Sequence, residues 1–182
     1  MLLKDLIAKN KITENLFKEL NQEILLHEVK GISSNSKEIK KDYIFVAIKG
    51  EKFDGADFIT EAEENGAFLI IAEKSYKKNV LFIKREKVRH IYTILLASFY
   101  SKQPKQIIGV TGTNGKTSTA EFCRQLWALA GWKSASMGTL GTKTETAVNK
   151  SIYKNSKENL TTFEPSDLYK NLKFLADKNI SH

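Results

Sequence analysis

The stretch that most constrains this 182-residue chain is a glycine-rich segment between residues 107 and 130. Two isoleucines and a valine within residues 107–110 predict a buried β-strand. Glycines stand at positions 109, 112 and 115, and apolar residues at helical spacing between residues 120 and 130 predict a helix. A strand, a glycine-rich loop, a lysine, a hydroxyl residue and a helix in this order are typical of a phosphate-binding loop in an α/β fold.

Each part of this segment has a chemical role. Glycines let backbone N–H groups approach phosphate oxygens closely, and the start of a helix presents unpaired N–H groups to the same anion. Lys116 can reach the outer phosphates as a mobile charge, and Thr117 offers a hydroxyl to Mg²⁺. The strict pattern has glycine where Val110 stands here. The alternative interpretation is a glycine-rich turn that binds no ligand.

The composition excludes several classes of protein. With 41% hydrophobic and 27% charged residues, the chain has the composition of a soluble globular protein, long enough for one domain and part of another. No apolar run approaches the roughly 20 residues of a membrane helix, and charged residues interrupt the N-terminus where a signal peptide would be apolar. One cysteine, Cys123, fits a reducing compartment. We therefore expect a cytoplasmic protein without a membrane partner.

The net charge of +8 comes almost entirely from lysine. Proteins that read nucleic-acid bases favour arginine, and the only arginines here are Arg85, Arg89 and Arg124. Scattered lysines are typical of solvated faces, and they can also attract polyanionic substrates such as ATP and a nucleotide sugar. Because the lysines are scattered and form no arginine-rich or aromatic-interleaved patch, we predict no nucleic-acid partner. A gel shift with a salt titration tests this, since phosphate-backbone binding weakens steeply with salt.

The remaining pattern alternates helices with strands. We predict strands over residues 29–33, 43–48, 67–72, 80–83 and 132–139, and helices over residues 2–7, 56–65, 88–100 and from Pro165 onward. Residues 10–28 are weakly periodic and give no prediction, and His27 has no second ligand at metal spacing. Residues 141–159 predict a polar hairpin or loop. Residues 101–105 contain proline and charge and predict a linker.

The loop Gly112-Thr113-Asn114-Gly115-Lys116-Thr117 resembles the ATP loop of the Mur ligases and their folylpolyglutamate synthetase relatives. Those enzymes form amide bonds by ATP-driven activation of a carboxylate. The resemblance implies that Lys116 is catalytic, that Thr117 binds Mg²⁺, and that ATP is bound by Gly112, Thr113, Asn114, Gly115, Lys116, Thr117 and Ser118.

The first part of the chain resembles the N-terminal, UDP-binding domain of the same family. The family's Asp-Ser-Arg turn corresponds to Asn35-Ser36-Lys37, and its strand and loop correspond to residues 42–50 followed by Asp54-Gly55. The resemblance implies that the uridine diphosphate end of a substrate is contacted by Ser34, Ser36, Glu51, Lys52 and Phe53. The alternative for the serines is a simple role as turn formers.

Residues 137–141 and 160–165 resemble the member of the family that adds the third residue of the peptide. The resemblance implies that Thr161 and Thr162 contact the muramoyl dipeptide. It also implies that the substrates are UDP-N-acetylmuramoyl-L-alanyl-D-glutamate and a diamino acid, with meso-diaminopimelate expected, joined through an acyl phosphate. Phe163 and Leu160 depart from the family's usual proline and asparagine. The alternatives are the member that adds D-alanyl-D-alanine and a nucleotide- or UDP-sugar-binding fragment without catalysis.

The resemblance also implies a division of the chain. We expect an α/β UDP-muramoyl-binding domain at residues 1–102 and the first part of the ATP-binding central domain at residues 103–182, with the C-terminal domain of the family absent. A monomer without ligase activity of its own is therefore expected from these 182 residues. Exposed apolar side chains are expected at Ile107, Ile108, Val110, Trp127 and Trp132.

Overall fold

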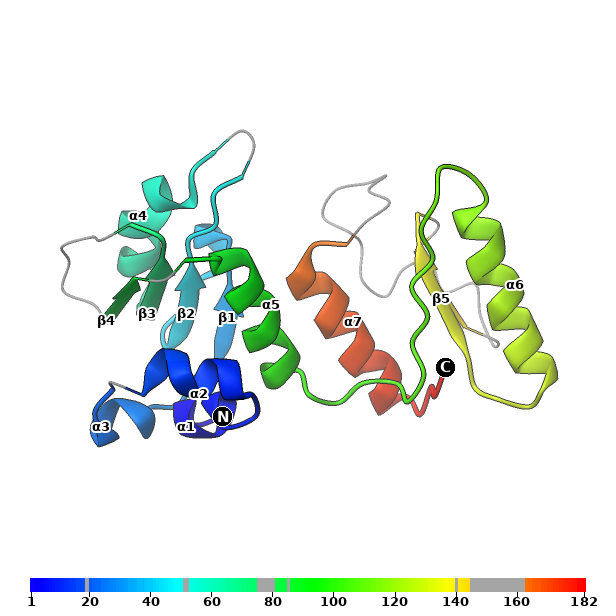
Figure 1. The fold of residues 1–182 in the computed structure, drawn as a ribbon, viewed down its shortest axis with the longest axis horizontal. Helices are drawn as coiled ribbons and strands as arrows, with labels where there is room; N and C mark the ends of the chain where they lie inside the picture. The colour runs from blue at the N-terminus through cyan, green and yellow to red at the C-terminus, as the bar shows by residue number, and fades with distance from the viewer. Residues whose placement is uncertain (19, 51–52, 75–80, 85, 140, 145–162) are drawn as a thin grey trace. The chain divides into compact units, whose positions relative to one another are not determined.

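The computed structural model describes the chain except for residues 19, 51–52, 75–80, 85, 140 and 145–162. It divides into two compact units, Met1–Phe99 and Tyr100–His182 (Figure 1). Among the residues described, no helix is both long and apolar enough to cross a membrane.

The first unit is built on a parallel sheet of four strands. Its strands lie in chain order: β1 (Gly31–Ser33), β2 (Tyr43–Val46), β3 (Ala67–Ala72) and β4 (Leu81–Lys84). Each neighbouring pair is parallel, with one register shift between Tyr43 and Ile44. The α/β class and the positions of these four strands confirm the prediction from the sequence.

Short helical segments connect and cover these strands. They are α1 (Leu3–Ile7), α2 (Lys11–Phe17), α3 (Gln22–Leu25), the 3₁₀ turns η1 (Ser36–Glu38) and η2 (Gly55–Phe58), α4 (Ile59–Glu64) and α5 (Val88–Phe99). The sequence predicted α1, α4 and α5 but missed α2 and α3. Asparagine caps begin both missed helices, because Asn10 accepts from the Ile12 N–H and Asn21 from the Ile24 N–H.

Side chains of β2 and β3 point to two buried faces of the sheet. Phe45 and Ile70 form one core cluster with Ile59 of α4. The alternate positions Ile44 and Leu69 are fully buried as well, and α5 contacts β1 and β2. A parallel sheet covered by helices on both faces is apolar on both faces, which explains the uninterrupted apolar sequence of β3.

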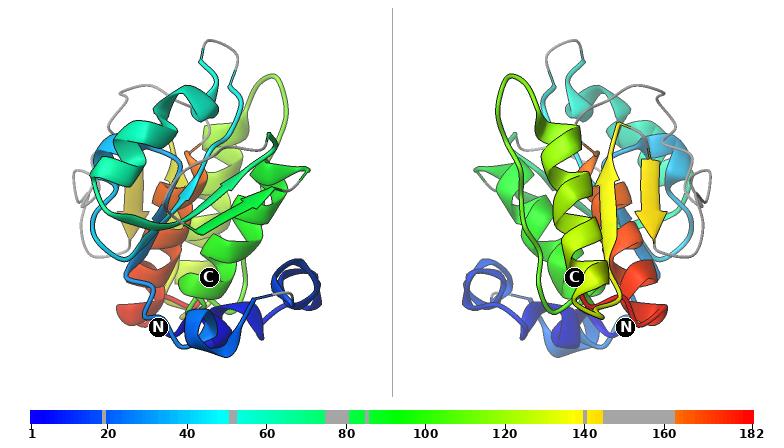
Figure 2. Two further views of the ribbon diagram at one scale, coloured as in Figure 1. Left: turned by 90° about the vertical axis from the view of Figure 1, so that its left-hand side faces the viewer. Right: turned by 90° about the vertical axis from the view of Figure 1, so that its right-hand side faces the viewer.

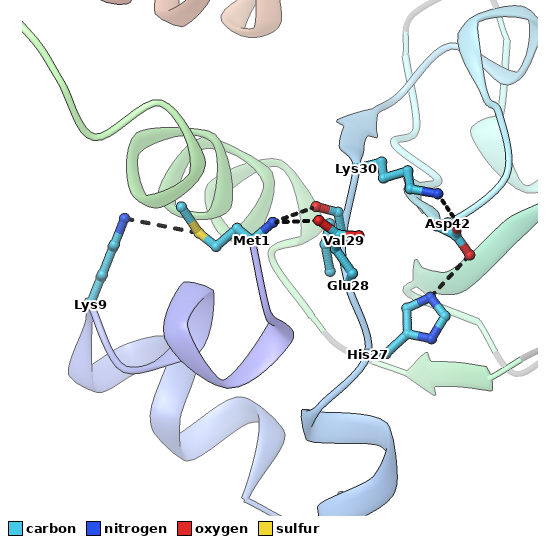
Figure 3. Close-up of polar contacts among 7 residues, drawn as sticks. All are labelled: Met1, Lys9, His27, Glu28, Val29, Lys30 and Asp42. Atoms are coloured by element: carbon cyan, nitrogen blue, oxygen red, sulfur yellow. Dashed lines mark hydrogen bonds and ion pairs between the residues drawn. The ribbon is translucent and has the colours of Figure 1, made fainter.

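The chain start is attached to the strand region by polar contacts (Figure 3). The Met1 ammonium group donates to the Val29 carbonyl at 3.2 Å and lies 3.8 Å from the Glu28 carboxylate. Lys9 donates to the Ser98 carbonyl at the end of α5 at 2.9 Å. These contacts join the N-terminal helices to β1 and α5.

His27 packs flat against Phe68, with ring centroids 3.6 Å apart. Its Nε2 lies 3.2 Å from the Asp42 carboxylate, and Lys30 binds the same carboxylate at 2.7 Å (Figure 3). The hydrogen bond from Lys30 lowers the pKa of Asp42 below its usual value. His27 therefore packs beside β3, through Phe68. Among the described residues, no group of three or more metal-binding side chains occurs.

The second unit contains two helices and a hairpin. They are α6 (Lys116–Leu129), β5 (Ala135–Gly138), β6 (Gly141–Thr144) and α7 (Pro165–Asp177), with β5 and β6 antiparallel. Residues 104–112 run as an extended segment beside α6 (Figures 1 and 2). The predicted strand near residues 132–139 and the helix after Pro165 are confirmed, and α6 begins earlier than predicted, at Lys116.

The predicted buried strand at residues 107–110 is wrong. Ile107 and Ile108 are 55% and 56% exposed, and within the described part of the chain this segment belongs to no strand ladder. An apolar sequence becomes a regular strand only when another strand pairs with its backbone. Within the described part of the chain, the backbone hydrogen bond next to this segment runs from the Gln106 N–H to the Ser181 carbonyl at 3.0 Å, and Ser181 belongs to no strand.

The loop after β2 depends on a close backbone approach at Gly55. A Cβ atom there would lie 2.5 Å from the Ile48 nitrogen and 2.7 Å from its carbonyl oxygen. We therefore expect Gly55→Ala to destabilise the first unit by about 1–3 kcal/mol, as overpacking does. Hydrogen exchange of the β3 amides should accelerate roughly 5- to 100-fold. Gly50→Ala is the matched control, since its closest contact is 3.3 Å, and equal exchange in both variants would contradict the expectation.

Candidate functional site

The glycine-rich loop ends at an open helix start. Gly112 and Gly115 have φ angles of +148° and +76°, which L-residues with side chains rarely adopt. Gly115 is the residue before α6, and no side chain caps this helix. The N–H groups of the first turn of α6 can therefore receive an anion, which the positive end of the helix dipole favours.

The lysine and the hydroxyl residue of the motif both lie at this helix start. The Lys116 ammonium group folds back over the loop and donates to the carbonyls of Gly112 at 2.5 Å and Thr113 at 3.3 Å. The Thr117 Oγ1 lies 3.4 Å from the Thr139 Oγ1. A phosphate group placed on the loop would meet Lys116 by displacing its contacts with neutral carbonyls, which a charged partner outcompetes. The donor set therefore fits a nucleotide phosphate and a hard cation.

Glu121 joins α6 to β5. Its carboxylate accepts hydrogen bonds from Arg124 at 2.6 and 3.0 Å, from Gln125 at 3.1 Å and from Ser136 at 2.9 Å. The Arg124 guanidinium group is the main reason why the pKa of Glu121 is lowered to about 2. Sequence analysis missed this anchor, although Glu121 and Arg124 have the i, i+3 spacing of a helix ion pair.

A cavity of about 420 Å³ lies within the second unit below the loop. It is lined by Ile107, Val110, Cys123 and Met137, and also by Lys116 and Thr117. The cavity is mostly apolar, and the unpaired segment at residues 107–110 forms part of it. The phosphate-binding loop thus follows residues 107–110, which line a cavity and, in the described part of the chain, pair with no strand.

Much of the apolar surface in this unit is exposed. The expectation of exposure is confirmed for Ile107, Ile108 and Trp132, the last at 48%, whereas Val110 and Trp127 are half-buried. On α6, the exposed apolar side chains are Phe122, Leu126 and Leu129.

The serine-rich turn after β1 is stabilised from within the protein. Ser36 is only 5% exposed, and its hydroxyl donates to the Glu61 carboxylate on α4 at 2.5 Å. The Asn65 amide donates to the Ser36 carbonyl at 3.0 Å. Ser34, in contrast, is half-buried. Of the two serines, Ser36 has its hydroxyl engaged in the fold.

The other candidates for the UDP-sugar contacts are only partly described. Phe53 is 70% exposed and makes an edge-to-face contact with Phe58, with ring centroids 6.3 Å apart. Glu51 and Lys52 lie outside the described residues, as do Thr161 and Thr162. The structure thus brings Lys116, Thr117 and the loop glycines together and leaves the contacts with the dipeptide as predictions.

Two protein-family profiles match most of the chain. The profile described as "Mur ligase family, catalytic domain" matches residues 28–103, and the "Mur ligase middle domain" matches residues 110–182. The curated UDP-N-acetylmuramoyl-L-alanyl-D-glutamate–2,6-diaminopimelate ligase of Brucella melitensis is 39% identical over 158 residues, covering 85% of this chain and 31% of that protein. The ligase of the same name from Rickettsia prowazekii is 39% identical over 166 residues, covering 90% and 34%.

Solved structures show the same fold. One described as UDP-N-acetylmuramoyl-L-alanyl-D-glutamate–2,6-diaminopimelate ligase matches with a TM-score of 0.70 and 23% identity, covering 92% of this chain and 34% of that one. The chain spans about a third of the length of the curated relatives described above.

The ionised carboxylate of Glu121 is expected to stabilise the second unit. The pKa of Glu121 is lowered from its ordinary value of 4.5 to about 2. The stabilisation that the ionised carboxylate provides is therefore fully present above pH 4.5 and is lost as the pH falls towards 2. Glu121→Gln should lower the free energy of unfolding by about 1–3 kcal/mol at pH 7, the usual value of hydrogen bonds to a charged group. The difference from the unmodified chain should shrink between pH 4.5 and 2.

Urea unfolding followed by the fluorescence of Trp127 and Trp132 measures this effect, since both lie in the same unit as Glu121. Glu164→Gln is the control, because Glu164 is exposed and its side chain makes no cap hydrogen bond to α7. A loss of stability in Glu121→Gln that is the same at every pH would show that the charge of Glu121 is not the cause.

Proposed function

This chain belongs to the Mur ligase family, and we propose that it carries the UDP-sugar-binding and ATP-loop domains of a peptidoglycan-precursor ligase. The reaction joins a diamino acid, 2,6-diaminopimelate, to UDP-N-acetylmuramoyl-L-alanyl-D-glutamate at the expense of ATP. The names of the relatives that are 39% identical support this substrate pair. The observation that carries the proposal is Lys116 folded over an uncapped helix start that follows two left-handed glycines.

In this proposal the loop residues bind and orient the triphosphate. Backbone N–H groups from Gly112 to Ser118 surround the phosphates, and Lys116 offsets the charge that develops during phosphoryl transfer. The Thr117 hydroxyl is one oxygen ligand of Mg²⁺. When bound, ATP would supply the phosphoryl group that converts the D-glutamate carboxylate into an acyl phosphate, with ADP as the leaving group, and Mg²⁺ would supply positive charge; the amine of the diamino acid then displaces inorganic phosphate and forms the amide.

The first unit has the complementary role of holding the UDP end of the substrate. We place Ser34, Glu51, Lys52 and Phe53 in contact with it, and we place Thr161 and Thr162 near the dipeptide. The buried hydroxyl of Ser36 supports a different role, in which this residue keeps the turn in shape through Glu61. In this proposal residues 1–102 form the UDP-muramoyl-binding domain, and residues 103–182 form the first part of the ATP-binding domain. We also propose a monomer that acts in the cytoplasm, a reducing compartment that the single free thiol, Cys123, fits.

The unpaired segment before the loop favours a second candidate function for these 182 residues, which is nucleotide binding without turnover. A loop that follows an exposed Ile107 and Ile108 is less well ordered in advance than one that follows a buried strand. Phosphate release measured with ATP, Mg²⁺, the UDP-muramoyl dipeptide and 2,6-diaminopimelate separates the two candidates, since only a ligase releases phosphate in a substrate-dependent way.

Lys116→Ala should weaken binding of ATP with Mg²⁺ to the chain by about 10- to 100-fold. This is the loss expected when one charged hydrogen-bond donor to phosphate is removed. Isothermal titration calorimetry measures it. Lys133→Ala, which removes an exposed lysine of the same unit, is the matched control and should bind as the unmodified chain does. Equal affinity in the Lys116 variant would remove the ATP-loop assignment.

Two serine substitutions test the assignment of the first unit. Ser34→Ala should weaken binding of the UDP-muramoyl dipeptide by several-fold without changing stability, because a neutral hydrogen bond contributes about 1 kcal/mol. Ser36→Ala should instead destabilise the fold, since it leaves the Glu61 carboxylate without its donor. Calorimetry with the substrate and thermal unfolding, run on both variants, distinguish the roles. The reverse pattern would show that Ser36 is the ligand.

A further inference from the structure

We propose that Thr139 is a positioning residue that holds the Thr117 hydroxyl in the orientation needed to bind a divalent cation. The proposal rests on the function proposed above, because it concerns the same loop. The two hydroxyl oxygens lie 3.4 Å apart, and either can donate to the other. Both residues are exposed, so a nucleotide and its cation can reach Thr117.

A hydroxyl that binds a cation does so through an oxygen lone pair, so its hydrogen has to point away from the cation. A threonine hydroxyl has one hydrogen and two lone pairs. If Thr117 donates its hydrogen to Thr139, both lone pairs of Thr117 remain available. Mg²⁺ demands near-ideal octahedral geometry, so a fixed direction of this oxygen matters for its affinity.

Two backbone carbonyls just before α6 compete for the Thr117 hydroxyl hydrogen. A threonine in a helix divides between two rotamers, because its hydroxyl can also donate to a carbonyl three or four residues earlier. For Thr117 those carbonyls belong to Asn114 and Thr113, both in the phosphate-binding loop. An acceptor at Thr139, in the turn directly after β5, therefore draws the hydroxyl away from these carbonyls and leaves them undisturbed.

The position of Thr139 relative to α6 is set by two side-chain contacts between the helix and the strand. Glu121 lies one helical turn after Thr117, on the same face, and accepts from Ser136 at 2.9 Å. The buried Ser134 donates to the Arg124 carbonyl at 2.8 Å. Since these contacts fix β5 along α6, Thr139 at the end of β5 is held beside Thr117. Thr139 thus acts through Thr117 and does not itself contact the cation.

Calorimetric titration of the chain with ADP, at increasing Mg²⁺ and in EDTA, tests this role. Thr139→Val should raise the Mg²⁺ concentration for half-maximal ADP binding about 3- to 10-fold, the effect of one net hydrogen bond. The affinity for ADP in EDTA should not change. Thr139→Ser, which restores the hydroxyl, should behave as the unmodified chain does. Thr119→Val, an exposed threonine of α6, is the matched control.

A double-mutant cycle makes the result specific. Thr117→Val should weaken the Mg²⁺ dependence of ADP binding, because it removes one of several ligands of the cation. Adding Thr139→Val to this variant should then cause no further loss. A further loss in the double variant, or an unchanged Mg²⁺ dependence in Thr139→Val, would overturn the role of Thr139 while leaving a lysine-dependent ADP site intact. Equal ADP binding by Lys116→Ala and the unmodified chain would instead contradict the proposed function of the loop itself.

Discussion

A parallel sheet has to be covered on both faces, and most of the first unit follows from this constraint. Parallel strands cannot be joined by tight turns, so each connection crosses a face and brings helical segments with it. The crossing through α4 covers the face that carries Phe45 and Ile70. Because all four strands run the same way, the turn after β1 and the loop after β2 leave the sheet at the same edge. The residues that we propose for the UDP site follow these two strands, so the topology favours their proximity although they are distant in sequence.

The second unit relies on side-chain hydrogen bonds where the first relies on a sheet. Its ladder is a two-stranded hairpin, and a hairpin alone gives little stability in water. Glu121 compensates by binding Arg124, Gln125 and Ser136 at once, so that helix and strand keep one register. This arrangement places Thr117 and Thr139 side by side although 22 residues separate them. The exposed apolar side chains of α6 show how little of this helix is packed.

The chemistry of the loop combines mobile and fixed groups. Within the described part of the chain, the Lys116 ammonium group donates to carbonyls of its own loop, and it can exchange these contacts for a phosphate with little cost to the fold. The helix N–H groups are fixed and need no rearrangement to receive the anion. A hydroxyl that binds a cation is partly fixed and partly mobile, because the position of its oxygen is set by the backbone while its hydrogen can rotate. A neighbouring acceptor is the simplest way to limit that freedom.

The sequence by itself determined the α/β class, the four strands of the first unit and the motif from Gly112 to Thr117. These features depend on local periodicity and on residue types that few other structures tolerate. Only the tertiary structure decided three further points. It left residues 107–110 without strand partners among the residues that the structure describes, it buried the Ser36 hydroxyl against Glu61, and it brought Thr139 to Thr117. Strand pairing, burial and contacts between distant residues depend on neighbours from other parts of the chain. The residues next to each position in the sequence do not determine which neighbours these are.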